Sequence, residues 1–219
     1  MSLFEFIPSL LSGLGVTLTL TGGGALVAVV LAWLAGLARL SHFGPLRLAA
    51  ATYVETFRGT SALVQLYWFF YALPLFGIEL SATATGIIVL GLNIGAYGAE
   101  VVRGAVLSID RGQSEAAAAL NLSNLKRLWI VIAPQALLRM LPPAGNLLIE
   151  LLKSTALVSL ITLNDLTFRG MLLRAETLRT VEVFGLLLII YFCVAQVLTL
   201  GLHAAERRLS KAWHLEGAR

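Results

Sequence analysis

Residues 183–203, which read VFGLLLIIYFCVAQVLTLGLH, decide the class of fold to which this chain belongs. The stretch contains no Lys, Arg, Asp or Glu. About 20 mostly apolar residues in a helix cross a hydrocarbon core about 30 Å thick. Since lipid offers the backbone no hydrogen-bond partner, such a stretch has to be helical. The sequence therefore predicts an all-α integral membrane protein.

Four further stretches share this apolar character: residues 16–37, 60–76, 82–106 and 143–163. We therefore expect five transmembrane helices within a single transmembrane domain that covers residues 1–219. The stretch at 60–76 is the shortest and the most aromatic, so its ends are the hardest to place. Residues 1–15 are amphipathic and predict a short helix at the membrane interface.

The composition and the distribution of charge agree with a membrane protein. Of the 219 residues, 58% are apolar and 13% are charged, whereas soluble domains have about 25% charged residues. The net charge of +4 arises from basic residues between the apolar stretches, a pattern that does not indicate nucleic-acid binding. An N-terminus outside and a C-terminus inside place most Lys and Arg in the inner loops.

The inner loop at residues 108–134 is longer than a simple connection and reads as two helices joined by a turn. Asp110 is expected to cap the first helix, with Gln113 as the reciprocal partner of a capping box. The alanine-rich residues 114–120 favour a helix strongly. Asn121 tolerates the left-handed conformation and can end this helix.

The second helix of the pair is expected over residues 124–131, with Ser123 as its cap and Pro134 ending or kinking it. Two roles for the pair are open. A small helix with apolar anchors such as Leu120 and Leu125 fits the groove of a partner protein. The alternative is a surface helix folded onto the membrane domain of its own chain.

A spaced pattern runs through this loop: Glu115-Ala116-Ala117, Asn121, Val131 and Ala133-Pro134. It resembles the EAA loop of ABC importer permeases, and the spacing agrees throughout. Three residues depart from that pattern, with Asn121 in place of Gly, Val131 in place of Ile and Ala133 in place of Leu. The first departure is compatible with the helix pair because Asn tolerates a positive φ.

Two further segments narrow the resemblance to the polar amino acid permeases. Residues 55–60 read ETFRGT and are followed by LVQL at 63–66, with Ser61 where that family commonly has Pro. Residues 153–157 read KSTAL and resemble the K-(D/N)-T-S-L segment of the same family. The motifs stand in the family's order along most of the chain.

The resemblance implies the permease fold of a type I ABC importer in a bacterial inner membrane, and a set of partners. A second permease subunit, identical or related, pairs with the chain, two ATPase subunits dock inside, and a solute-binding protein delivers substrate outside. ATP and Mg are expected on the ATPase, because this chain has no phosphate-binding loop and is not itself an enzyme. The expected ATPase-docking residues are Glu115, Ala116, Ala117, Leu120, Asn121 and Leu125.

Polar residues within or beside the spans are candidates for the substrate path, because they are costly in a membrane unless they are paired or hydrated. They are Gln65, Asn93, Lys153, Ser154, Thr155, Asn164 and Asp165. A polar amino acid, or a related zwitterion such as ectoine, needs both a cationic and an anionic partner. Lys153 and Asp165 fit those roles, but Lys153 can also pair with Glu150 and Asp165 can also cap a helix.

The sequence contains two further charged pairs and leaves other classes of protein open. Glu100 with Arg103, and Glu55 with Arg58, stand three residues apart and predict structural ion pairs. A secondary transporter or channel is one alternative, although five spans and an inner docking loop fit it poorly, and a structural membrane subunit is another, which the identity of the partners would separate from an importer. The chain has no His-Glu-x-x-His or Gly-x-Ser-x-Gly motif, so we expect no catalytic or metal-binding residues.

Overall fold

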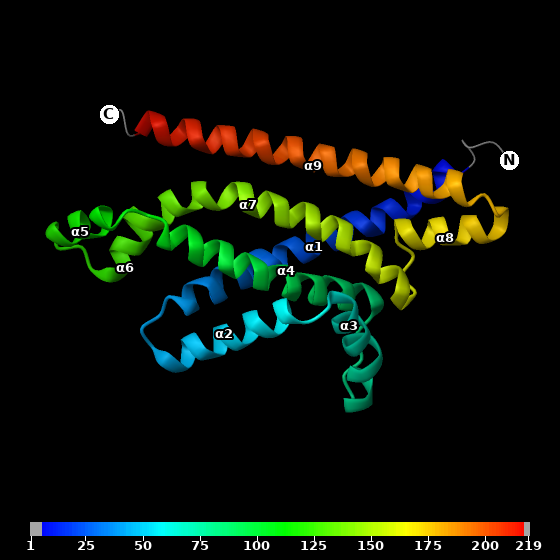
Figure 1. The fold of residues 1–219 in the computed structure, drawn as a ribbon, viewed down its shortest axis with the longest axis horizontal. Helices are drawn as coiled ribbons and strands as arrows, with labels where there is room; N and C mark the ends of the chain where they lie inside the picture. Colours follow the sequence, from blue (N-terminus) through cyan, green and yellow to red (C-terminus); the bar gives the residue numbers. More distant parts are fainter. Residues whose placement is uncertain (1–5, 217–219) are drawn as a thin grey trace.

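The computed structural model describes residues 6–216, with side chains as far as Arg208. Within this part of the chain every regular element is helical. The four longest helices are α1 (Ile7–Arg39), α4 (Ala82–Leu107), α7 (Ala133–Ser154) and α9 (Thr180–Glu216). The shorter ones are α2 (Gly44–Gly59), α3 (Ala62–Tyr67), α5 (Arg111–Ala119), α6 (Asn124–Lys126) and α8 (Leu166–Thr177). Figure 1 shows the long helices running along a common direction.

Four segments of π or 3-10 helix extend these elements: η2 (Trp68–Ala72), η3 (Leu73–Phe76), η4 (Arg127–Ile132) and η5 (Thr155–Ile161). α6, η4, α7 and η5 form one helical run, Asn124–Ile161. The segments α3, η2 and η3 likewise form one short apolar run, Ala62–Phe76. This second run projects from the bundle in Figure 1.

Small residues bring α1 and α4 into close contact. A Cβ atom at Gly36 of α1 would lie 2.7 Å from the Cβ atom of Val102 on α4. A Cβ atom at Gly98 would lie 2.7 Å from the Cβ atom of Ala32, and Gly91 is equally close to Val27. Membrane helices associate through such small residues because water does not drive them together. The α1–α4 contact is therefore the packed centre of the bundle.

A second contribution to the core comes from apolar side chains of five elements. Leu20 of α1, Leu66 of α3, Leu90 of α4, Leu151 of α7 and Val158 of η5 are all buried in one cluster. The cluster joins segments that lie far apart in the sequence. It fixes the start of α3 against α4 and η5, so the projecting run is anchored at its first turn.

Four helices in the described residues are long and apolar enough to cross a membrane: Ile7–Arg39, Ala82–Leu107, Asn124–Ile161 and Thr180–Arg208. They contain the predicted spans at 16–37, 82–106 and 183–203 and most of the span at 143–163. That last span ends at Ile161, because Thr162 has a φ of 63° and leaves the helix. The predicted span at 60–76 falls on the shorter apolar run and stays a prediction.

The structure differs from the expected interfacial helix at the start of the chain. Residues 7–15 belong to the same helix, α1, as the first apolar stretch, and residues 1–5 lie outside the described part. Leu10 and Gly13 of this segment are buried. A Cβ atom at Gly13 would lie 2.7 Å from the carbonyl oxygen of Asp165, which explains why the segment packs inside the bundle.

Ion pairs tie α1, α2 and α4 together at the end where α1 finishes. Glu100 of α4 pairs with Arg39 of α1 and, at 2.8 Å, with Arg103 of its own helix, as predicted from their spacing. Glu55 of α2 lies 3.5 Å from Arg39 instead of pairing with Arg58. The guanidinium of Arg58 stacks instead on the Tyr97 ring, 5.2 Å from its centroid.

Candidate functional site

The inner helix pair predicted at residues 108–134 is present as α5 followed by α6 and η4. Asp110 caps α5, with Oδ1 accepting from the backbone N–H of Gly112 at 2.6 Å. Ser123 caps α6 by accepting from the N–H of Lys126 at 3.5 Å. The side chain of Gln113 contacts Gln135 instead of closing a capping box. Both predicted caps are therefore confirmed, without the reciprocal bond from Gln113.

The turn between the two helices depends on a left-handed residue. Asn121 has a φ of 56°, as expected from its place after the alanine-rich helix. Its N–H donates to the carbonyl of Ala118 at 2.9 Å, and the N–H of Leu122 donates to the carbonyl of Ala117 at 3.1 Å. These bonds satisfy carbonyls that the end of α5 would otherwise leave unpaired.

Replacing Asn121 with valine should destabilise this turn by about 1–2 kcal/mol, because a β-branched residue at positive φ is strained. Asn121→Gly should leave the turn intact, since glycine adopts this conformation without strain. Limited proteolysis in the α5–α6 loop measures the effect. Equal cleavage rates in the wild type and Asn121→Val would show that the left-handed turn does not depend on the side chain.

Pro134 does not end the second helix, so of the two outcomes predicted for it, an end or a kink, the first is wrong. The chain passes through the π segment η4, in which the N–H of Ala133 donates to the carbonyl of Leu128, five residues earlier. α7 then begins with Pro134 in its first turn, where the missing N–H of proline costs little. As a result, the helix pair is continuous with the long helix α7.

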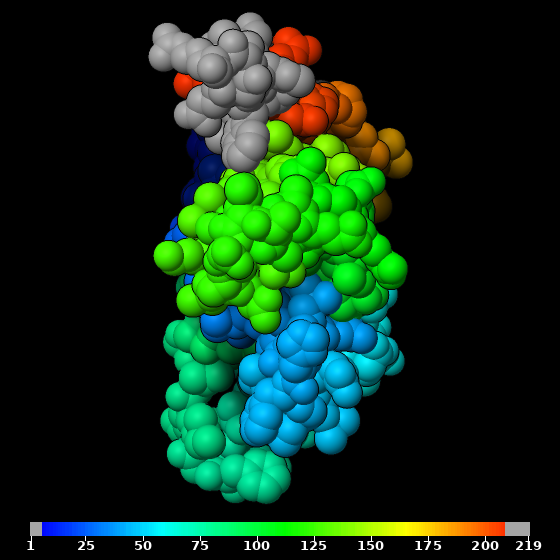
Figure 2. Space-filling model, turned by 90° about the vertical axis from the view of Figure 1, so that its left-hand side faces the viewer, coloured from blue at the N-terminus to red at the C-terminus, as the bar shows by residue number. Residues whose placement is uncertain are grey.

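The side of the helix pair that faces away from the bundle is apolar and exposed. Leu120 is 76% exposed and Leu125 is 68% exposed. Glu115 and Ala116 are exposed beside them, whereas Ala117 is buried. Figure 2 looks onto this end of the molecule, where the helix pair, in green, covers the middle of the face. Most of the six predicted docking residues are therefore open to a partner.

Polar and aromatic contacts hold the helix pair together and join it to α7 and α1. Arg127 donates to the hydroxyl of Ser114 at 3.2 Å, which joins η4 to α5. Arg139 of α7 donates to the hydroxyl of Ser108 at 2.9 Å, close to the start of α5. Trp129 stacks on Trp33 of α1 with their ring centroids 6.5 Å apart. These contacts connect the helix pair to α7 and α1.

Two of the predicted path residues, Gln65 and Asn93, meet at the break between α2 and α3. The amide of Asn93 donates to the Gln65 side chain at 3.2 Å and to the carbonyl of Phe57 at 3.0 Å. Gln65 also donates to the Phe57 carbonyl, at 3.0 Å, and to the hydroxyl of Thr60, at 2.7 Å. The pair satisfies a carbonyl at the end of α2 where the helix is interrupted.

Asp165 is fully buried and caps α8. Its side chain accepts from the N–H of Phe168 at 2.9 Å and from the N–H of Thr167 at 3.2 Å. The pKa of the Asp165 carboxyl is raised by burial, and the hydrogen bonds from these N–H groups offset only part of that rise. Asp165 therefore has the geometry of a helix cap, which was the alternative role predicted for it.

The remaining path candidates differ in their surroundings. Lys153 and Asn164 are exposed, Ser154 is half-buried, and Thr155 is fully buried with its hydroxyl donating to the carbonyl of Leu152 at 2.7 Å. Within the described residues, no ion pair joins Lys153 to Glu150. The structure therefore brings Gln65 and Asn93 together but leaves Lys153 and Asn164 separate from them.

Sequence reasoning missed a polar cluster beside Asp165. The hydroxyl of Thr17 on α1 accepts from the N–H of Leu166 at 3.2 Å, and the hydroxyls of Thr167 and Tyr191 lie 2.9 Å apart. The cluster joins α1, α8 and α9. Threonine and tyrosine within apolar stretches gave no sign of a shared position, because 149 residues separate Thr17 from Leu166.

The chain resembles known membrane transport proteins over most of its length. Residues 28–211 match the family described as "Binding-protein-dependent transport system inner membrane component". The chain is 40% identical over 213 residues to the probable amino-acid ABC transporter permease protein y4tF of Sinorhizobium fredii, covering 94% of this chain and 90% of that one. It is 35% identical to the glutamine transport system permease protein GlnP of Escherichia coli, covering 95% and 96%.

Solved structures agree with these relatives. A crystal structure of an amino acid ABC transporter with histidines has a chain that superimposes with a TM-score of 0.87 at 35% identity, covering 94% of this chain and 96% of that one. An inward-facing structure of the MetNI methionine ABC transporter has the same fold, with a TM-score of 0.80 at 20% identity, covering 95% and 99%. The chain therefore belongs to the inner membrane components of binding-protein-dependent transport systems, as an amino acid ABC transporter permease and not an ATPase.

Proposed function

We propose that this permease moves an amino acid or a related zwitterion inward, and that a separate ATPase drives it through the helix pair α5–α6. The observation that carries the proposal is the continuity of this pair with the spanning run Asn124–Ile161. The face with Leu120 and Leu125 is exposed, while Arg139 of α7 bonds to Ser108 beside the start of α5 and Trp129 stacks on Trp33 of α1. A protein that docks on this face can therefore move α7 directly.

We further propose five membrane crossings within one domain, with the N-terminus outside and the C-terminus inside. The fifth crossing is the segment at residues 60–76, which corresponds to the apolar run Ala62–Phe76 between α2 and α4. In support, the start of α1 lies with α8 at one end of the molecule, and the helix pair lies at the other (Figure 1). Inner loops rich in Lys and Arg support the same orientation.

The proposed partners are an ABC ATPase dimer on the helix pair, a second permease subunit, and a solute-binding protein outside. The family description itself specifies transport that depends on a binding protein. On the ATPase side we assign contact to Glu115, Ala116, Ala117, Leu120, Asn121 and Leu125. ATP and Mg would bind to the ATPase subunits.

The substrate we propose is a polar amino acid or a zwitterion of similar size. Relatives at 35–37% identity are named for transport of L-cystine, glutamine and octopine, all of which carry amino and carboxyl groups. We propose that the Gln65–Asn93 pair lines the path at the helix break, since non-helical backbone at membrane depth is tolerated beside a hydrated cavity. The exposed Lys153 is placed to attract a carboxylate, with Ser154, Thr155, Asn164 and Asp165 near it in sequence.

Glu115→Lys tests the docking role. Charge reversal at an exposed interface position should weaken ATPase binding about tenfold or more, while the membrane domain stays folded. Co-purification of the ATPase in mild detergent and substrate uptake by cells measure the two effects. The matched control is Glu176→Lys, an equal change at an exposed residue of α8 at the other end of the molecule.

Two results would contradict the proposal. If complex assembly and uptake both survive Glu115→Lys, Glu115 has no part in docking. If the wild-type chain is recovered without any ATPase even after crosslinking, the helix pair does not couple to one, and a channel or secondary transporter becomes the better interpretation.

A further inference from the structure

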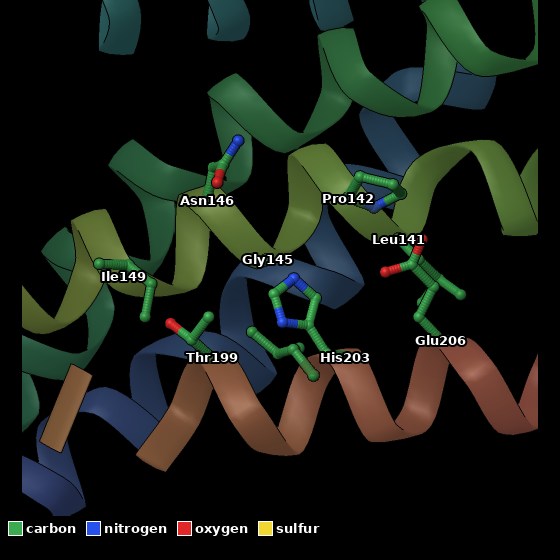
Figure 3. A pocket seen from close by; sticks show the side chains of 9 residues that line it. Leu141, Pro142, Gly145, Asn146, Ile149, Thr199, His203 and Glu206 are labelled. Carbon is green, nitrogen blue, oxygen red and sulfur yellow. The ribbon is translucent and has the colours of Figure 1, made fainter. Parts of the chain in front are cut away.

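A pocket of about 160 Å³ with both apolar and polar lining residues lies between α7 and α9, away from both the helix pair and the Gln65–Asn93 pair. Its lining includes Leu141, Pro142, Gly145, Thr199, His203 and Glu206. Figure 3 shows His203 and Glu206 extending from α9 toward α7. Gly145 leaves room at the centre, where a Cβ atom would touch Leu202 at 3.4 Å.

The two ionisable groups of the pocket have no assigned role in transport. Glu206 is half-buried, and His203 stands one helical turn before it on the same face of α9. In the part of the chain with described side chains, Glu206 takes part in none of the four ion pairs. A carboxylate in the last turns of an apolar helix is costly unless it meets water or a cation. The pocket is therefore suited to a positively charged group.

An apolar cavity of about 310 Å³ adjoins this pocket. The two spaces share Leu141 and Leu202, and the apolar one extends between α1, α4 and α7 past Ala28, Ile94 and Leu147. These residues belong to the middle of the apolar helices, whereas Glu206 is followed by the exposed basic residues Arg207 and Arg208 near the end of α9. The lining of the two spaces thus becomes less polar from Glu206 toward the middle of the apolar helices.

We propose that this pair of spaces binds a phospholipid with a primary-amine headgroup, such as phosphatidylethanolamine. The ammonium group meets Glu206, and an acyl chain enters the apolar cavity past Leu141 and Leu202. The apolar cavity favours a lipid over an amino acid, because a free amino acid would leave that cavity unfilled. Arg207 and Arg208 supply positive charge at the level of the lipid phosphate. The proposal does not depend on the transported substrate or on the ATPase.

The test is lipid binding by the purified chain, together with any subunits that accompany it. The chain is delipidated in detergent, incubated with phosphatidylethanolamine, phosphatidylcholine or phosphatidylglycerol, and examined by native mass spectrometry. The wild type should retain phosphatidylethanolamine over phosphatidylcholine, whose quaternary ammonium donates no hydrogen bond. Glu206→Gln should lower that retention about tenfold, the typical loss for a hydrogen bond to a charged group.

Two further variants separate this site from general effects. Gly145→Leu fills the pocket and should exclude the lipid whatever its headgroup. Glu176→Gln removes an exposed carboxylate on α8 and should change nothing. Circular dichroism checks that each variant is folded, and glutamine keeps the size and shape of the half-buried Glu206 side chain.

Three outcomes would overturn the proposal. One is equal retention of the three lipids by the wild type, and another is unchanged retention of phosphatidylethanolamine by Glu206→Gln. The third is a disulfide between two copies carrying Thr199→Cys in a Cys193→Ser background, because that would seat a second copy of this chain in the groove.

Discussion

Gly36→Leu is expected to prevent the permease from folding into a stable bundle. A Cβ atom at this position would already lie 2.7 Å from the Cβ atom of Val102 and 2.8 Å from the carbonyl oxygen of Ala99. Real Cβ atoms do not approach other atoms this closely, and the carbonyl belongs to the backbone of α4. Overpacking of this kind costs about 1–3 kcal/mol for small additions and more for a leucine side chain.

The measurement is the yield of monodisperse protein in mild detergent and its thermal unfolding midpoint. Gly36→Ala should lower the midpoint, and Gly36→Leu should leave little folded protein. Gly22→Leu is the matched control, because nothing lies within 4 Å of a Cβ atom at Gly22 on the same helix. If Gly36→Leu melts at the wild-type temperature, the close α1–α4 contact does not support the fold.

Asp165→Ala is expected to have the second largest effect, a loss of about 3 kcal/mol of stability. The change leaves the part-buried N–H groups of Thr167 and Phe168 without an acceptor, at about 1 kcal/mol or more for each group. It also removes the cap of α8, which is worth about 1 kcal/mol. The cap holds α8 against Thr17 of α1, so the end of the bundle should loosen as a unit.

The comparison with Asp165→Asn separates a cap from a substrate ligand. Asparagine keeps an oxygen acceptor, so it should retain most of the stability and most of the uptake rate. Asp110→Ala removes a cap from the exposed helix α5 and should cost less, because water can replace the lost acceptor. A large loss of uptake in Asp165→Asn at unchanged stability would instead assign the Asp165 charge to the substrate path.

Local features of the fold were predictable because they depend on neighbours in the sequence. Apolar length located the four long helices, and residue type located the caps at Asp110 and Ser123. Asn121 was expected at a positive φ and has one. In each case the physical cause lies within a few residues, so the sequence contains it.

Features that depend on distant contacts were not predictable in the same way. Pro134 was expected to end or kink the second helix, and the chain instead continues through a π segment into α7 without ending. Asp165 was open to two roles, and its burial against α1 could not be read from the local sequence. The pairing of Gln65 with Asn93 likewise spans 28 residues and two helices. The candidate site was therefore predicted at the helix pair and only partly in the substrate path.

The uninterrupted run Asn124–Ile161 has a mechanical consequence. It contains 38 residues, and at about 1.5 Å of rise per residue it is a rod roughly 57 Å long. A tilt of about 10° around its midpoint would carry each end roughly 5 Å, in opposite directions. In the orientation proposed above, closing motion at the inner face would thus open the outer end by lever action, without any helix having to unwind.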